Sequence, residues 1–285
     1  MPIAHILTHV VVVPLAAALM VMVVASMILR ERGRPWPALL ALLAGGIAGI
    51  VSNPNLSWPL RPEEAEDWLG PTLLVAAMIE WCATRWPKVF GRLRFLLAVG
   101  VAWILAVPVR DFFEWTDAEL TRLLIAIGFG WSIAVSLHRF AARRLAVPGL
   151  LLVMVMQGSV LSMLVVESSF ATAAEAIGML TAPIGLMLAY AWWRPEALDL
   201  RFIPGVWVAS LLFMGLDAHF YADLPWRGII LVLLAPALCW LRMPEGADPR
   251  HRAIRAAVYA LPFLAAAVLL DGGLFPEEGP DAVTS

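Results

Sequence analysis

The chain has 285 residues, of which 61% are hydrophobic and only 15% are charged, and its mean hydropathy is +0.83. A soluble domain is about half apolar and about a quarter charged, so this composition excludes a water-soluble globular protein and predicts one surrounded by lipid. The net charge of −2 does not by itself indicate a partner. We expect the lipid bilayer as the surroundings and no nucleic acid.

The apolar stretches predict an all-α protein. Only helices or a closed barrel can span lipid, because every backbone amide must be paired within the structure. The stretches are too long for barrel strands and do not alternate between polar and apolar residues. We therefore expect a polytopic integral membrane helical bundle of about ten transmembrane helices. The expected spans are 6–29, 37–52, 70–85, 94–109, 120–138, 147–166, 173–193, 203–218, 226–241 and 254–270.

The connecting segments alternate in charge along the chain. Every second segment is basic, and together these segments hold 16 of the 20 lysines and arginines. Lysine and arginine are enriched on the cytoplasmic side of membrane proteins. This pattern predicts a multi-pass protein of a bacterial cytoplasmic (inner) membrane with both termini on the non-cytoplasmic side.

One transmembrane domain is expected over residues 1–272, followed by a short, acidic, flexible tail over residues 273–285. The longest connecting segment, 52–69, is too short for a soluble catalytic module. Cys82 and Cys239 are expected as buried apolar thiols. No motif indicates a cofactor, and HExxH, GxSxG and P-loop patterns are absent from the sequence.

A polar stretch in the middle of the chain gives the first candidate site. Gln157 lies at the centre of an apolar span, and Ser159 follows two residues later. An amide in lipid needs a hydrogen-bonding partner. These residues are therefore expected either to bind a substrate near the midplane or to hold helices together. Gly158 and Ser162 favour the second alternative, because small residues four apart allow close helix packing.

Glu80 is an acidic residue placed well inside an expected span, near a basic end. A carboxylate in lipid requires a cation or a proton. We expect Glu80 either to contribute to a proton-coupled transport site or to pair with Arg85 or an arginine of a neighbouring helix.

A second candidate cluster lies on the expected outer side. Histidines one helical turn apart, together with carboxylates, can bind a metal ion, and an arginine can bind the phosphate of a lipid-linked substrate. The alternative is a set of interfacial residues with structural hydrogen bonds. The members are His5, His9, Arg110, Asp111, Glu167, Glu175, Asp217 and His219.

Three functions follow from these candidates. The first is a small-solute or lipid transporter that uses Gln157, Ser159 and Glu80. The second is a membrane-embedded enzyme or assembly factor that acts at the outer leaflet through the outer cluster. The third is a structural subunit that binds other membrane proteins.

Overall fold

A computed structural model describes residues 6–29, 36–53, 65–83, 85–168, 170–194, 198–240 and 248–271. His5, the tail 273–285 and the greater part of the segment 52–69 lie outside the described residues. Within these residues every regular element is helical. The elements are η1 (Ile6–Val12), α2 (Val13–Leu29), α3 (Trp36–Ser52), η2 (Glu66–Trp68), α4 (Leu69–Ala83), α5 (Pro87–Ala106), α6 (Asp117–Arg144), α7 (Val147–Glu167), α8 (Ala171–Trp193), α9 (Ile203–Ala222), α10 (Trp226–Leu234), η3 (Ala235–Trp240) and α11 (Pro249–Asp271).

Each apolar stretch singled out in the sequence coincides with one helix or with two consecutive helices. Among the described residues, six helical segments are long and apolar enough to cross a membrane: Leu7–Ala25, α6, α7, α8, α9 and most of α11. Shorter apolar helices occur at α3, at α4 and at Trp226–Ala237. The expectation of an all-helical protein is confirmed, and the six long apolar helices indicate a membrane protein.

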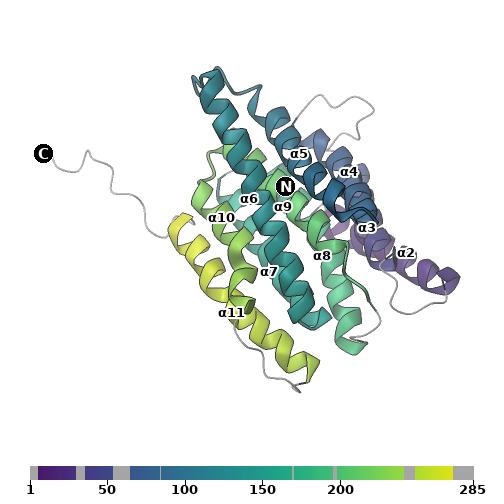
Figure 1. Ribbon diagram of the computed structural model, residues 1–285. Helices are drawn as coiled ribbons and strands as arrows, with labels where there is room; N and C mark the ends of the chain where they lie inside the picture. Colours follow the sequence, from purple (N-terminus) through teal and green to yellow (C-terminus); the bar gives the residue numbers. More distant parts are fainter. Residues whose placement is uncertain are drawn as a thin grey trace, which may run out of the picture.

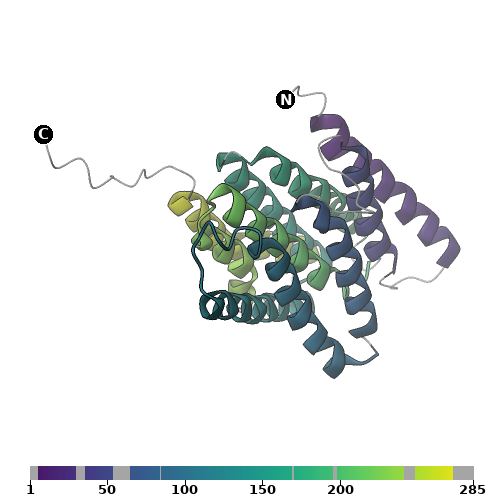
Figure 2. The ribbon, with the colours of Figure 1, turned by 90° about the horizontal axis from the view of Figure 1, so that it is seen from above.

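Helix α9 is the central element of the bundle. It contacts α4, α5, α6, α7, α8 and α10. Within its most apolar stretch, 94% is buried inside the protein, against 28% for the corresponding stretch of α11. In two perpendicular views α2 and α11 lie at opposite edges of the bundle (Figures 1 and 2). Side chains on all sides of α9 are therefore in the protein interior, and large residues such as Trp207 and Phe213 are fully buried there.

Small residues allow close contacts between helices. A Cβ atom added to Gly45 of α3 would lie 2.3 Å from Pro183 Cγ of α8, and one added to Gly158 of α7 would lie 2.2 Å from Thr181 Oγ1 of α8. Ser162 Oγ of α7 also donates a hydrogen bond to the carbonyl oxygen of Ala174 in α8 (3.0 Å). The predicted stripe of small residues at Gly158 and Ser162 is confirmed as a packing surface.

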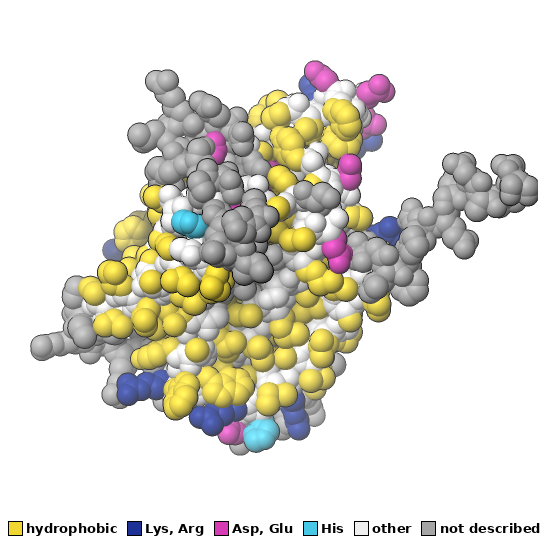
Figure 3. Space-filling model, turned by 180° about the vertical axis from the view of Figure 1, so that it is seen from behind, with side chains coloured by type: hydrophobic (Ala, Val, Ile, Leu, Met, Phe, Trp, Pro, Cys, Tyr) yellow, Lys and Arg dark blue, Asp and Glu magenta, His cyan; other side chains and the backbone are white. Residues whose placement is uncertain are grey.

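The two ends of the bundle differ in charge. Most of the acidic side chains visible in Figure 3 gather at one end and several basic ones at the other, with a hydrophobic band between them. At each end of the bundle, helix ends that are distant in the sequence meet. The end of α4, the end of α6 and the start of α9 surround one cavity, and Tyr221 near the end of α9 bonds to Leu105 near the end of α5 (3.1 Å). We call the end that holds this cavity the basic end, and the end that holds Tyr221 the acidic end.

Candidate functional site

Gln157 lies at the junction of four helices and is fully buried. Its Nε2 donates a hydrogen bond to the carbonyl oxygen of Val232 in α10 (2.7 Å). Its Oε1 accepts a hydrogen bond from Trp207 Nε1 of α9 (3.3 Å) and lies 3.0 Å from His138 Nε2 of α6. We call Gln157, His138 and Trp207 the amide cluster.

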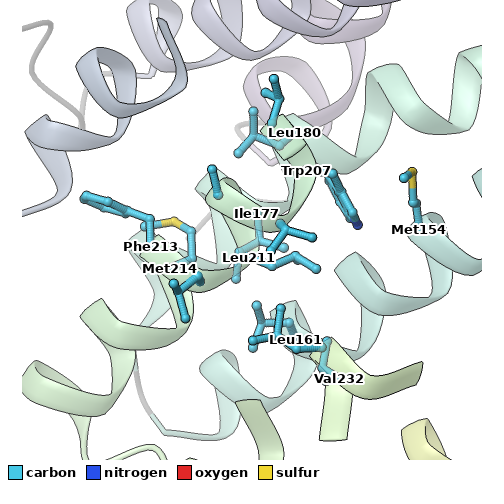
Figure 4. Packing of buried hydrophobic residues seen from close by; sticks show 14 of the residues in the cluster. Met154, Leu161, Ile177, Leu180, Trp207, Leu211, Phe213, Met214 and Val232 are labelled. Atoms are coloured by element: carbon cyan, nitrogen blue, oxygen red, sulfur yellow. The ribbon is translucent and has the colours of Figure 1, made fainter. Parts of the chain in front are cut away.

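The surroundings of the amide cluster are apolar and closely packed. Figure 4 shows the Trp207 ring extending from α9 toward the helix that carries Met154, with Leu161 and Val232 nearby. His138 is also fully buried, and its Nδ1 lies 2.8 Å from the carbonyl oxygen of Ala134 one turn earlier. Both polar atoms of the Gln157 amide have protein partners, so the geometry is that of a link between α6, α7, α9 and α10.

Ser159 does not face the amide cluster. Its side chain is exposed on the surface of the bundle, whereas Gln157 is buried. Two residues along a helix correspond to a rotation of about 200°, which places the two side chains on different faces of α7. The two residues predicted as parts of one midplane site are thus separated by the helix itself.

Glu80 is the centre of an ionic cluster near the basic end. Its side chain is only 2% exposed. Arg94 of α5 binds both of its oxygens, with Nε 2.6 Å from Oε1 and Nη2 3.3 Å from Oε2. Arg139 of α6 also bonds to Oε2 through Nη2. The expected pairing with an arginine of a neighbouring helix is confirmed, but two such arginines take part.

The local sequence makes room for this cluster. A Cβ atom at position 205 of α9 would lie 2.1 Å from Glu80 Cδ, so only glycine allows the carboxylate to pack against the backbone of α9. Arg94 comes two turns into α5, whose first residues carry a helix-starting proline. Arg139 lies near the end of α6, next to His138. The ionic cluster of Glu80, Arg94 and Arg139 therefore joins α4, α5 and α6 beside the start of α9.

A cavity of about 480 Å³ opens beside the ionic cluster. Its polar lining consists of Arg139, Arg143, Arg201 and Asp199, and Arg201 forms an ion pair with Asp199 (2.6 Å). The other lining residues are aliphatic: Ala83, Ala142, Leu145, Val147, Leu150, Leu198, Leu200 and Pro204. We call this space the arginine cavity. Its volume is within the range of small-molecule sites, about 300–1,000 Å³.

Two carboxylates of the predicted outer cluster are buried near the acidic end. Glu175 of α8 accepts a hydrogen bond from Asn53 Nδ2 beyond the end of α3 (2.8 Å). Asp217 of α9 is fully buried. Carboxylates are rarely fully buried unless they are paired, so both side chains belong to the protein interior and not to a solvated turn.

The remaining members of the outer cluster have other surroundings. Arg110 donates a hydrogen bond to the Trp115 carbonyl oxygen (3.1 Å) and pairs with Asp117 (2.8 Å), which fixes the turn before α6. His219 Nδ1 lies 2.7 Å from the Leu224 carbonyl oxygen, and its ring packs against Trp226. Asp111 and Glu167 are exposed, and His9 is half-buried. Among the described residues, no group of three or more His, Cys, Asp or Glu side chains is placed to hold a metal ion.

Several site residues were not singled out by sequence reasoning. Arg139 and Arg143 lie in one of the basic connecting segments and Trp207 lies inside an expected span, and neither position alone indicates a site. His138 does carry a sequence signal, because a histidine inside a long apolar helix indicates a buried polar contact. Asn53, the partner of Glu175, gave no signal beyond its place after an apolar stretch.

No known protein family matches the chain, and searches of the curated proteins and of the solved structures likewise returned no match.

Proposed function

We propose that the chain is a multi-pass protein of a bacterial cytoplasmic membrane that transports a small solute or a lipid through the arginine cavity. One observation carries this proposal. Arg139 lines the cavity and also binds the buried Glu80, so a solute that enters the cavity meets a charged group connected to the interior of the bundle. Ionisable residues inside membrane bundles commonly mark substrate or ion pathways.

The proposal includes ten membrane spans with both termini outside. The charge difference between the two ends of the bundle supports this orientation, because the basic end would face the cytoplasm. Helices α3 and α4 have 17 and 15 residues, which corresponds to about 26 and 22 Å at 1.5 Å per residue. They are short for about 30 Å of hydrocarbon, and local bilayer thinning accommodates such helices.

Accessibility from both sides of the membrane tests this function. Transport requires that one site be open to each side in turn. A single cysteine at Ala142, which lines the arginine cavity, is introduced after Cys82→Ala and Cys239→Ala. Its reaction with a membrane-impermeant thiol reagent is measured in inside-out and right-side-out vesicles. We expect fast reaction from the basic end and slower but finite reaction from the acidic end.

Matched controls make the result specific. A cysteine at Arg144, an exposed residue of the same helix end that does not line the cavity, should react from the basic end only. A cysteine at Ser159, on the surface of α7, should react from neither side, because lipid covers it. Reaction at Ala142 from one side only, or from neither, contradicts transport through this cavity.

A second candidate function is that of a membrane-embedded enzyme or assembly factor acting at the outer leaflet. The burial of Glu175 and Asp217 near the acidic end favours it. Asp217→Asn and Glu175→Gln should abolish such an activity while Ala142→Cys labelling stays unchanged. If these two variants instead change the labelling of Ala142→Cys from the two sides and leave an outer-leaflet activity intact, the result supports transport.

A further inference from the structure

Arg139 has bonding capacity that Glu80 does not use. A guanidinium group has five N–H donors, and only Nη2 of Arg139 is bonded to Glu80. Its Nε is buried and has no hydrogen-bond partner among the described residues. The side chain is 31% exposed, against 12% for that of Arg94. Arg139 is therefore the partner of Glu80 that can also reach a molecule in the cavity.

Glu80 does not depend on Arg139 for its charge balance. Arg94 binds both carboxylate oxygens of Glu80 by itself, which is the strong two-point geometry of an arginine–carboxylate pair. If Arg139 moves away, Glu80 stays paired inside the bundle. The ionic cluster is thus built from one fixed arginine and one exchangeable arginine.

The arginine cavity and the ionic cluster together have a surplus of positive charge. Among the residues that the structure describes, four arginines (Arg94, Arg139, Arg143 and Arg201) face two carboxylates (Glu80 and Asp199), which leaves two positive charges in excess. Arg143 lies one helical turn after Arg139, on the same face of α6. No ion pair of Arg143 occurs among the described residues, so its guanidinium is available for an anion.

The two excess positive charges and the non-polar lining of the cavity identify a class of ligand. A phosphate monoester carries about −1.5 to −2 charges at neutral pH and has three acceptor oxygens, whereas one arginine fork already satisfies a carboxylate. The non-polar lining consists only of alanine, leucine, valine and proline side chains. Among the described residues that line the cavity there is no aromatic ring on which a nucleotide base could stack, and this lining suits an aliphatic body.

We infer that the arginine cavity binds an aliphatic phosphate monoester, and that Arg139 exchanges its bond to Glu80 for one to the phosphate when the ligand enters. This inference rests on the proposed function, since it names the substrate class of the same cavity. The phosphate belongs either to a free metabolite or to the headgroup of an anionic lipid, because both reach a basic pocket between helix ends.

Direct binding measurements on the purified full-length protein test the inference. Glycerol 3-phosphate is the soluble probe, and its binding to the detergent-solubilised protein is measured by titration calorimetry in a phosphate-free buffer. A second set of measurements uses nanodiscs that contain dioleoyl phosphatidic acid, with phosphatidylcholine nanodiscs as the reference. We expect saturable binding of a phosphomonoester. Tight binding of glycerol 3-phosphate indicates a free metabolite, and selective retention of phosphatidic acid indicates a lipid.

Two neighbouring arginines provide the matched variants. Arg143→Gln removes a cavity guanidinium and should raise the Kd for the bound probe about tenfold or more, since a charge-assisted hydrogen bond is lost. Arg144→Gln removes the same charge from the adjacent residue, which does not line the cavity, and should leave the Kd unchanged. Equal Kd values for the two variants, or binding of sulfate and acetate as tight as that of the phosphomonoesters, would overturn the inference.

Glu80→Gln tests the exchange itself. Because Arg139 no longer has to leave a carboxylate, this variant should bind the phosphomonoester several-fold more tightly than the wild type, and weaker binding contradicts the exchange. Failure of the inference differs from failure of the proposed function. Two-sided labelling at Ala142 without phosphomonoester binding leaves a transporter of another solute, and binding without two-sided labelling leaves a binding protein that does not transport.

Discussion

The amide cluster around Gln157 and the ionic cluster around Glu80 are both polar groups buried in the same bundle, and they differ in what surrounds them. The amide of Gln157 has protein partners on both polar atoms, and its side chain is fully buried. Arg139 of the ionic cluster is partly exposed and lines a cavity of about 480 Å³.

This difference separates a structural role from a functional one. A buried polar group whose bonds all go to other helices stabilises one arrangement of those helices. A buried charge that is also part of a cavity wall can change partners when a ligand enters. The ionic cluster is therefore the better candidate for chemistry that involves a solute, although Gln157 is the more conspicuous residue in the sequence.

Removal of the Glu80 carboxylate should give the largest loss of stability. Glu80→Ala leaves the guanidinium groups of Arg94 and Arg139 without their shared anion in a largely buried place. Breaking a buried ion pair from one side costs about 3–5 kcal/mol of unfolding free energy. Denaturant titration in mixed micelles measures this loss. Glu167→Ala, which removes an exposed carboxylate of α7, is the control and should not change the midpoint.

Removal of the amide should give the next largest loss, without an effect on the cavity. Gln157→Leu leaves the indole N–H of Trp207 and the carbonyl of Val232 without their partner. Each unsatisfied buried group costs about 1–3 kcal/mol, so a loss of roughly 2–6 kcal/mol is expected for the two groups. Ser159→Ala changes an exposed side chain of the same helix and should be neutral. A stable Gln157→Leu protein that no longer labels at Ala142 would assign the amide a role in transport instead.

A methyl group at position 205 of α9 should weaken the ionic cluster, because it would press on the Glu80 side chain from α9. In Gly205→Ala the new Cβ overlaps Glu80 Cδ, at 2.1 Å in the present backbone, and overpacking of this kind costs about 1–3 kcal/mol. Gly100→Ala of α5 is the control, because its Cβ would meet nothing within 4 Å and alanine favours a helix over glycine by about 0.5–1 kcal/mol. The two substitutions should therefore change the unfolding midpoint in opposite directions.

The smallest effect is expected in the packing stripe between α7 and α8. Ser162→Ala removes the hydrogen bond to the Ala174 carbonyl oxygen (3.0 Å). Hydrogen bonds between membrane helices contribute about 0.6 kcal/mol on average, so a shift near the limit of detection is expected in the same titration. A loss comparable with that of Gln157→Leu would show that the stripe, and not the amide cluster, holds these helices together.

The sequence was sufficient for the helices and insufficient for the site. The length of the apolar stretches located the long helices of the described residues, since this length follows directly from the thickness of the bilayer. The pairing of Glu80 with an arginine was also predictable, because a carboxylate in lipid needs a cation. The identity of its partners was not, since Arg94 and Arg139 come from two helices whose adjacency depends on tertiary packing.

The separation of Gln157 from Ser159 was within reach of the sequence, because helical periodicity alone places residues two apart on different faces. The outer cluster was harder to judge. Glu175 is bonded to Asn53, which comes from another helix end, and His219 is held by a carbonyl oxygen of its own following turn. Contacts between distant segments and with backbone atoms give no periodic signal.

The most direct test compares one variant from each cluster in a single binding experiment. The Kd for a phosphomonoester probe and the unfolding midpoint are measured for Arg143→Gln and Gln157→Leu in the same detergent. We predict that Arg143→Gln raises the Kd about tenfold with an unchanged midpoint, and that Gln157→Leu lowers the midpoint while the folded fraction keeps the wild-type Kd. An unchanged Kd for Arg143→Gln together with a raised Kd for folded Gln157→Leu would contradict the assignment of the ligand site to the basic end.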